Sequence, residues 1–271
     1  MRRAALWCAV AALVFFVAFP FAWMIATAFK PAREIFVSPP TLLPASVTLE
    51  NLARLFAETR FATYLANSLL VASGTVVLTL AVAVPGAYGL TRYRFRFREA
   101  ISATILFTYM FAPIMIIIPF YVLMRALGLI NTHLGLVLAY TAFCLPFALW
   151  LLRTYFQGIP AELEEAALTD GASRAQAVAR VVLPLALPGV IATATFTFIL
   201  AWNDYIFARV LISADELKTL PVGIADLYNA SVVDWGMIMS AGMVVLVPVL
   251  AMFLFVQRSL VAGWGAGGVK G

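Results

Sequence analysis

The chain has 271 residues, of which 64% are hydrophobic and 11% are charged, and its mean hydropathy is +0.99. Soluble globular domains are about half apolar and about a quarter charged, so this composition excludes a fold whose surface faces only water. The formal net charge of +5 does not indicate nucleic-acid binding, because the basic residues form no stripe with interleaved aromatics and lie mostly between apolar runs.

Six apolar stretches are long enough to cross the hydrocarbon core of a bilayer, which takes about 20 residues of helix. Long apolar runs without the alternation of a barrel strand predict helices, since a helix satisfies its own backbone hydrogen bonds in lipid. We therefore expect an all-α, polytopic membrane protein with six transmembrane helices, in which residues 1–271 form a single domain. The predicted spans are Leu6 to Phe29, Asn67 to Leu90, Ile101 to Leu123, Leu134 to Leu152, Leu187 to Phe207 and Met237 to Val256.

The Lys and Arg residues between these spans are unevenly distributed. Eleven lie on the side of the N-terminus and seven on the other side, where the loops are longer, so the positive-inside rule predicts that both termini are cytoplasmic. The bias is clearest in the short link from Thr91 to Arg98, which we interpret as an inside anchor. The inner set is Arg2, Arg3, Arg92, Arg94, Arg96, Arg98, Arg153, Arg174, Arg180, Arg258 and Lys270, and the outer set is Lys30, Arg33, Arg54, Arg60, Arg125, Arg209 and Lys218.

The predicted spans lack the groups on which self-driven carriers and intramembrane enzymes depend. Ion-coupled carriers place ionisable residues well inside their spans, whereas here Asp204 lies near the outer end of the fifth span and His133 in a short outer turn. The sequence has no Gly-x-Ser-Gly nucleophile and no glycine-rich loop ending in lysine. Cys8 and Cys144 lie inside apolar stretches and indicate neither a disulfide nor a metal site. We predict a transport protein with no catalytic residues, which needs another chain to hydrolyse nucleotide.

One inner loop, residues 153–185, carries the signals of a short capped helix. It contains Pro160, acidic residues in the first turns and Gly171 after the last turn. A second short helix, from about Arg174 to Val182, is expected to be broken by Pro184 before the fifth span. An ordinary helix-turn-helix link and a partner-binding element both remain open. The face offered to a partner would hold Leu163, Ala166, Ala167 and Asp170, at positions i, i+3, i+4 and i+7.

This loop resembles the EAA motif of ABC importer permeases, in which Glu-Ala-Ala, three residues and Gly are followed nine residues later by Ile-x-Leu-Pro. Here Glu165-Ala166-Ala167 precedes Gly171, and Val181-Val182-Leu183-Pro184 departs only by Val for Ile. The resemblance covers nearly the whole chain and points to the carbohydrate-uptake branch, to subunits similar to the smaller permease of the maltose transporter. Other matching pieces are Pro39-Pro40, Asn67-Ser68-Leu69, Gly128-Leu129-Ile130-Asn131-Thr132, Trp202-Asn203-Asp204, Gln257-Arg258 and Gly267-Gly268-Val269-Lys270-Gly271.

The resemblance implies an ABC type I importer permease fold, with a transmembrane core over residues 66–257, in a bacterial cytoplasmic (inner) membrane. It also implies a complex with a second permease, two copies of a cytoplasmic ATPase and an extracytoplasmic solute-binding protein. ATP and Mg would bind the ATPase, so no cofactor is expected in this chain, and no nucleic acid is an expected partner. The implied ATPase-coupling residues are Glu165, Ala166, Ala167, Asp170, Gly171, Leu183 and Pro184, of which Glu165 would supply charge-assisted hydrogen bonds and Gly171 a left-handed turn.

The implied substrate is a sugar or a sugar-like solute. An ABC permease for another solute, such as glycerol phosphate or a polyamine, is the first alternative, and a self-sufficient carrier is the second. A candidate substrate path in the fifth span, suited to an uncharged polyol, consists of Thr193, Thr195, Thr197, Trp202 and Asn203.

Two interpretations remain open for these polar residues and for the end of the chain. Ser and Thr in membrane helices also bond to the backbone or to a neighbouring helix. Trp202-Asn203-Asp204 has the composition of an interfacial anchor with a helix-ending cap. The glycine-rich tail after Arg258 is either without fixed structure or a docking segment for the ATPase.

Overall fold

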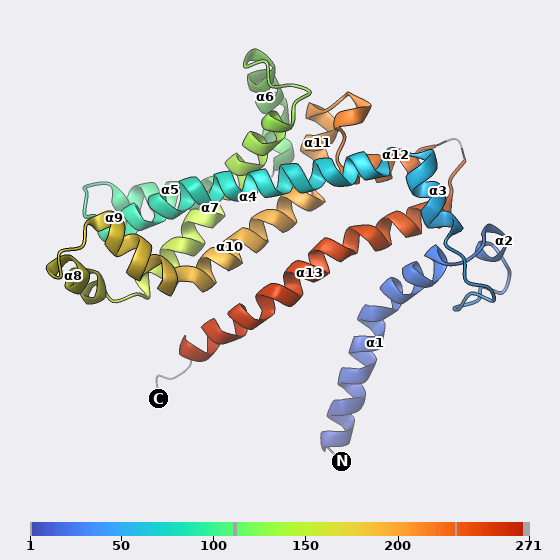
Figure 1. Cartoon of the computed structure of the whole chain (residues 1–271), viewed down its shortest axis with the longest axis horizontal. Coiled ribbons are helices and arrows are strands. Elements are labelled where there is room, and N and C mark those ends of the chain that lie inside the picture. The colour runs from blue at the N-terminus through green and yellow to red at the C-terminus, as the bar shows by residue number, and fades with distance from the viewer. Residues whose placement is uncertain (1, 111–112, 231, 268–271) are drawn as a thin grey trace.

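The computed structural model describes residues 2–110, 113–230 and 232–267. Within them every regular element is a helix, and these residues contain no strand, which confirms the all-α fold. Figure 1 shows α4 (Phe61–Arg92), α7 (His133–Gln157) and α10 (Leu183–Asn203) running side by side, with α13 (Trp235–Gly267) next to α10 and α1 (Arg2–Ala28) against α13. The tail beyond Gly267 lies outside the described residues.

The three central helices approach closely because small residues occupy their contact faces. Ala83 and Ala87 of α4, Ala148 of α7 and Ala186 and Gly189 of α10 are all buried. In a membrane, where lipid tails are as apolar as leucine, close contact between backbones is a main source of helix association. These three helices therefore form the rigid centre of the bundle.

Among the described residues, five helices are long and apolar enough to cross a membrane, and they overlap five of the six predicted spans. The third predicted span, Ile101 to Leu123, differs, because the structure forms two helices there, α5 (Arg98–Thr108) and α6 (Pro113–Ala126). α5 ends at Thr108 and α6 begins at Pro113, a position in the first turn where the missing N–H of proline costs no hydrogen bond. The number of six spans remains a prediction. The five segments are Leu6–Ala28, Phe61–Arg92, His133–Gln157, Arg174–Asn203 and Trp235–Leu254.

The inner loop of residues 153–185 forms α8 (Ala161–Thr169), α9 (Arg174–Ala177) and a π-helical turn, η1 (Val178–Val182), which runs directly into α10. The prediction that Pro184 breaks the helix is wrong. The Leu183 N–H bonds to the Val178 carbonyl, five residues back, and Pro184 lies in the first turn of α10. A π turn shifts the hydrogen-bond register, so the ring of the proline is accommodated without a break.

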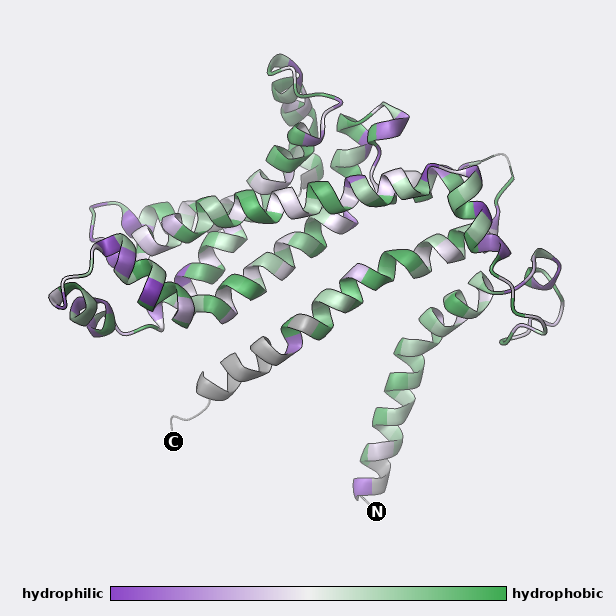
Figure 2. Cartoon of the chain, in the orientation of Figure 1, coloured by the Kyte–Doolittle hydropathy of each residue, from purple (hydrophilic) through white to green (hydrophobic). Residues whose placement is uncertain are grey.

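Short helices cover the end of the bundle opposite α8. They are α2 (Ala32–Ile35), α3 (Glu50–Glu58), α11 (Ile206–Leu211), the 3-10 turn η2 (Asp215–Leu217) and α12 (Leu220–Tyr228). We call the end that holds α8 and the last turn of α4 the inner end, and the end that holds residues 61–68 the outer end. Figure 2 shows hydrophilic residues gathered around α8 and α9 and around α3, and apolar residues along α1 and the coloured part of α13.

Candidate functional site

The α8 helix ends in a tight cap built around a glycine. Gly171 has a φ of +88°, a left-handed conformation that residues with a β-carbon adopt poorly. The Ala172 N–H bonds to the Ala167 carbonyl at 3.0 Å, and the Gly171 N–H bonds to the Leu168 carbonyl at 3.1 Å. This pair of bonds is a Schellman motif, which satisfies carbonyls that the helix end would otherwise leave free. The sequence signal of glycine after the last turn thus corresponds to a defined stop.

Glu164 is the buried residue of α8, with only 6% of its surface exposed. Its Oε2 lies 3.0 Å from the Arg92 Nε, and its Oε1 accepts a hydrogen bond from the Tyr88 hydroxyl. Arg92 also donates to the Ile159 carbonyl at 3.1 Å. Because Tyr88 and Arg92 belong to the last turns of α4, one carboxylate connects α8 to the inner end of that helix.

The opposite face of α8 is uncovered. Leu163 is 45% exposed, and Glu165 and Ala166 are exposed beside it. Of the other predicted coupling residues, Asp170 and Gly171 are exposed at the end of the helix and Ala167 is half-buried. Leu183 and Pro184 lie apart from them, at the start of α10, where Leu183 packs against the inner apolar cluster and Pro184 is exposed.

An apolar cluster beneath the loop holds it against the bundle. The Tyr88 ring meets the rings of Tyr93 and Phe156 edge-on, with centroids 6.1 and 6.3 Å apart. The guanidinium of Arg174, from α9, lies 5.4 Å from the centroid of the Tyr93 ring. Edge-on aromatic pairs and a cation over a ring each add to the packing of the surfaces that they join. Residues of α4, α7 and α9 thus share one cluster under the loop.

The outer end of α4 is bound to the segment that follows α11. The Asn67 amide donates to the carbonyls of Glu216 and Lys218 at 2.8 and 2.9 Å. The neighbouring Ser68 hydroxyl accepts a hydrogen bond from the Leu220 N–H at 2.8 Å. The Asn67-Ser68-Leu69 piece of the family resemblance therefore has a structural role here, which is to fix η2 and the start of α12.

A second asparagine fixes the same segment from the other side. Asn131 has a φ of 59°, and its Oδ1 accepts from the N–H groups of Ser213 and Ala214 at 3.0 and 2.8 Å. Its own N–H donates to the Leu211 carbonyl at 2.8 Å. The Nε2 of His133, which we expected in a short outer turn, lies 3.1 Å from the Leu217 carbonyl.

Three of the five residues of the candidate substrate path form hydrogen bonds within their own helix, α10. The hydroxyls of Thr193 and Thr195 donate to backbone carbonyls four residues earlier, each at 2.8 Å, and the exposed Asn203 amide does the same. Trp202 is 1% exposed and stacks on Phe198 with centroids 5.5 Å apart, and Thr197 is fully buried. These contacts fit the structural interpretation for Thr193, Thr195 and Asn203. The Thr197 hydroxyl and the Trp202 indole N–H are buried with no hydrogen-bond partner among the described residues, and the role of all five in transport stays a prediction.

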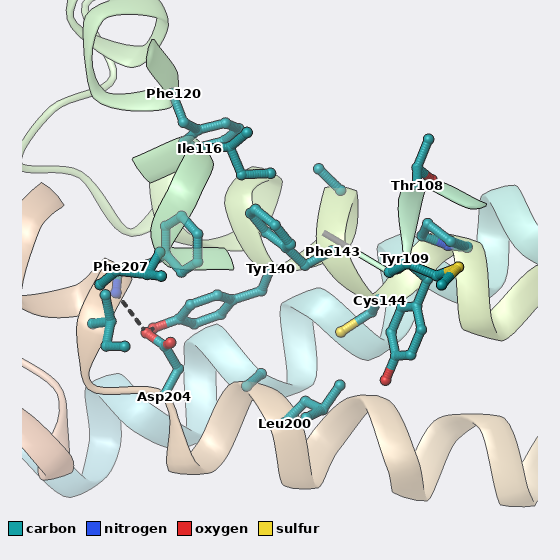
Figure 3. A pocket seen from close by; sticks show the side chains of 16 residues that line it. Thr108, Tyr109, Ile116, Phe120, Tyr140, Phe143, Cys144, Leu200, Asp204 and Phe207 are labelled. Atoms are coloured by element: carbon teal, nitrogen blue, oxygen red, sulfur yellow. Dashed lines mark hydrogen bonds between the residues drawn. The ribbon is translucent and has the colours of Figure 1, made fainter. Parts of the chain in front are cut away.

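A cavity of about 680 Å³ lies instead between α5, α6, α7, α10 and α11 (Figure 3). Its wall is largely apolar, with Asp204 and Tyr140 among its few polar groups. The Asp204 carboxylate accepts from the Tyr140 hydroxyl at 2.9 Å and from the Phe207 N–H at 3.0 Å. Asp204 is the C-cap residue that ends α10, and its carboxylate also caps the start of α11. None of the five candidate path residues lines this cavity.

Comparison with known proteins gives matches along the chain. A family model described as "Binding-protein-dependent transport system inner membrane component" matches residues 75–261. The inner membrane ABC transporter permease protein YcjP of Escherichia coli is 37% identical over 100% of this chain and 98% of its own length. The diacetylchitobiose uptake system permease protein DasC of Streptomyces coelicolor is 36% identical over 98% of this chain and 97% of its own.

A solved structure is similar over nearly the same length. It is a bacterial ABC transporter involved in the import of the acidic polysaccharide alginate, and its matching chain is 27% identical with a TM-score of 0.80. The alignment covers 95% of this chain and 98% of that one.

Proposed function

The chain belongs to the family of binding-protein-dependent transport system inner membrane components, and from this premise we propose that it is the permease subunit of an ATP-driven importer for a sugar or a sugar-like solute. Two of the similar proteins are named for the import of carbohydrates, diacetylchitobiose and alginate. Within the complex this chain would supply part of the path through the membrane, while a partner chain hydrolyses ATP.

The observation that carries the proposal is the α8 helix, which is fixed to the bundle on one face and uncovered on the other. We assign the contact with a cytoplasmic ATPase to the uncovered face. Ala166 lets the surface of a partner come close, and Glu165 offers a carboxylate to a cationic or N–H donor group. The Gly171 cap ends the helix sharply, so the docking surface has a defined length.

Two copies of the ATPase, a second permease and an extracytoplasmic binding protein complete the proposed complex. The ATPase must reach α8, so the proposal places the inner end and both chain termini in the cytoplasm. Labelling of Ser173→Cys, in a chain in which Cys8 and Cys144 have been replaced, tests this orientation. Ready reaction of intact cells with a membrane-impermeant thiol reagent would contradict it, and reaction only after permeabilisation would support it.

Reconstitution tests the substrate class. We propose to assemble the four kinds of subunit in vesicles and to measure ATP-dependent uptake of maltose, trehalose and diacetylchitobiose, with glycerol phosphate and spermidine as the competing solutes. The expected result is uptake of at least one sugar and of neither competitor. Uptake of only glycerol phosphate or spermidine would contradict the sugar as the substrate and would support another solute. Uphill uptake by this chain alone under a proton or sodium gradient would overturn the ABC mechanism.

A further inference from the structure

Two adjacent glutamates of α8, which point about 100° apart around the helix, differ in burial. Glu165 is exposed on the surface assigned to the ATPase, whereas Glu164 is buried and already occupied by two partners on α4. A carboxylate whose oxygens are both engaged inside the chain offers nothing to a second protein. Glu164 therefore has a role distinct from that of its neighbour, although both belong to the same acidic run.

Glu164 forms a buried ion pair with Arg92. The side chains of Arg92 and Glu164 are 14% and 8% exposed, and the Tyr88 hydroxyl binds the second carboxylate oxygen. Breaking a buried pair by removing one partner leaves an uncompensated charge away from water, which is strongly unfavourable. Removing one partner of this pair is therefore expected to cost more than removing one partner of an ion pair in solvent.

The helix at the other side of this bond runs the full height of the bundle. α4 has 32 residues, which is about 48 Å of helix. At its outer end Asn67 and Ser68 bind the backbone of residues 216–220, and Tyr64 donates to the Asp215 carboxylate at 3.0 Å. One helix is thus joined to α8 at one end and to the outer segment at the other.

We propose that Glu164, held by Arg92 and Tyr88, is a positioning residue that makes α4 move together with α8. A displacement of α8 by the ATPase then reaches the outer segment of residues 215–220 through α4 itself. This inference rests on the proposed function, because it assigns a second residue to the coupling that the EAA loop performs. Glu165 binds the partner, and Glu164 transmits the motion.

A double-mutant cycle tests the proposal in the reconstituted complex, with the sugar that supports uptake by the unchanged protein. The variants are Glu164→Ala, Arg92→Ala and the two combined, and the quantity measured is the ratio of sugar-stimulated to basal ATP hydrolysis. Each single variant is expected to lower the ratio about tenfold. The combined variant should be no worse than the single ones, because residues that act as a pair are not additive. Unchanged ratios in both single variants, or losses that add, would overturn the proposal.

The ion pair between Arg153 and Glu99, whose carboxylate is more exposed than that of Glu164, is a control for position. It lies at the same end of the bundle, joins α7 to α5 at 2.8 Å and does not involve α8. Glu99→Ala should therefore leave the ratio of stimulated to basal hydrolysis unchanged. A loss as large as that of Glu164→Ala would show that any inner ion pair matters equally, and it would contradict a special role for Glu164.

A cross-link distinguishes a positioning role of Glu164 from a purely stabilising one. In a chain with Cys8 and Cys144 replaced, Glu164→Cys and Arg92→Cys are joined by a short bifunctional maleimide. If the pair transmits motion, the cross-linked complex should recover stimulated hydrolysis and uptake that the unlinked cysteine variant lacks. Cross-linking that restores thermal stability without restoring stimulation would overturn the proposal.

A distance measurement does not depend on the identity of the sugar. Spin labels at Glu162→Cys and Arg94→Cys report the separation of α8 from the end of α4 in the purified complex. The distribution should be narrow with Glu164 present and broad in Glu164→Ala. If the unchanged complex transports no sugar but the two distributions differ, the proposed function is wrong and the positioning role of Glu164 is supported. If the complex transports sugar but the two distributions are the same, only the positioning role of Glu164 is wrong.

Discussion

The two ends of α4 are held in different ways. At the outer end, Asn67 and Ser68 bind backbone groups of the segment after α11, and Asn131 holds the same segment. The half-exposed Asp215 of that segment also bonds to Tyr64 and pairs with Arg60. At the inner end, a single buried ion pair and a cluster of aromatic rings join α4 to α8 and α7. Bonds to backbone groups hold the segment after α11 in one conformation, whereas a packed cluster around one ion pair holds two helices in contact. We therefore expect the segment at the outer end to resist local unfolding, and the helices at the inner end to move together.

The largest expected effect on stability is at the inner end, where α10 touches α7. A β-carbon on Gly189 would lie 2.4 Å from the Tyr155 ring, so Gly189→Val forces the two helices apart. We expect the free energy of unfolding of the purified protein to fall by about 3 kcal/mol, the upper part of the range for overpacking. Gly89→Ala is the matched control in α4, because its nearest neighbour lies 4.0 Å away. Equal midpoints for the two variants in thermal unfolding would mean that the inner end is not tightly packed.

The next effect is at the outer end. Asn67→Ala removes both hydrogen bonds to the carbonyls of Glu216 and Lys218, and those carbonyls lose their partners in a partly buried place. We expect a loss of about 2 kcal/mol in the free energy of unfolding. Asn203→Ala, an exposed amide bonded only to its own helix, should change it by much less. Increased proteolysis between residues 213 and 220 would localise the change, and its absence would argue that Asn131 alone holds the segment.

The third prediction concerns the uncovered face of α8. Gly171→Val strains the left-handed cap, at a local cost of about 1–2 kcal/mol, and Glu165→Lys reverses the charge offered to the ATPase. With both changes the protein should still insert in the membrane, while sugar-stimulated ATP hydrolysis and uptake fall together. Membrane content, co-purification of the ATPase and stimulated hydrolysis are measured in parallel. Normal uptake with normal stimulation would show that this loop is not the coupling element.

The smallest effect is expected from charges at the outer surface. The pKa of the Asp215 carboxyl is lowered, first by the hydrogen bond from Lys218, and that bond in turn raises the pKa of the lysine. Because the folded pKa lies below the unfolded one, the stabilisation from Asp215 is present above about pH 4 and is lost as the pH falls through the folded pKa. Both groups are near solvent, so the change should stay below about 1 kcal/mol.

Thermal unfolding of the unchanged protein and of Asp215→Asn, followed between about pH 6 and pH 3, measures this contribution. The two curves should converge at the acid end. A constant difference across that range would mean that the hydrogen bond of Asp215 with Tyr64, and not its charge, supports the outer end.

The sequence predicted the fold class, because long apolar runs leave helices as the only open choice in lipid. It also located α8 and its glycine cap, since proline, acids and glycine act locally and need no tertiary contact. The division of the third predicted span at Pro113 and the continuity of α10 past Pro184 were not predicted. In both places the effect of a proline depends on the hydrogen-bond register around it, which the residue types do not specify.

The contact of Glu164 with Arg92 and Tyr88 was also not predicted. Arg92 was counted only as a charge that orients the chain, and Glu164 only as an acid in a first turn. A weak signal was available: Glu164 shares a face of α8 with the apolar Ala167 and Leu168, three and four residues later, and lies about 100° around the helix from Leu163. Which of two adjacent glutamates turns inward depends on the path of α4, about 70 positions earlier in the chain, and local patterns do not carry that information.

The π turn of Val178–Val182 has the effect of one extra residue inserted into the continuous helix formed by α9 and α10. Each residue of an α-helix advances the direction of the side chains by about 100°, so one extra residue in the turn of Val178–Val182 resets the angular phase between α9 and α10. The membrane part of α10 keeps Gly189 towards α7, while α9 keeps Arg174 over Tyr93. Deletion of Ala179 would turn α9 by about 100° relative to α10. The loop that carries α8 would then leave the bundle in a different direction.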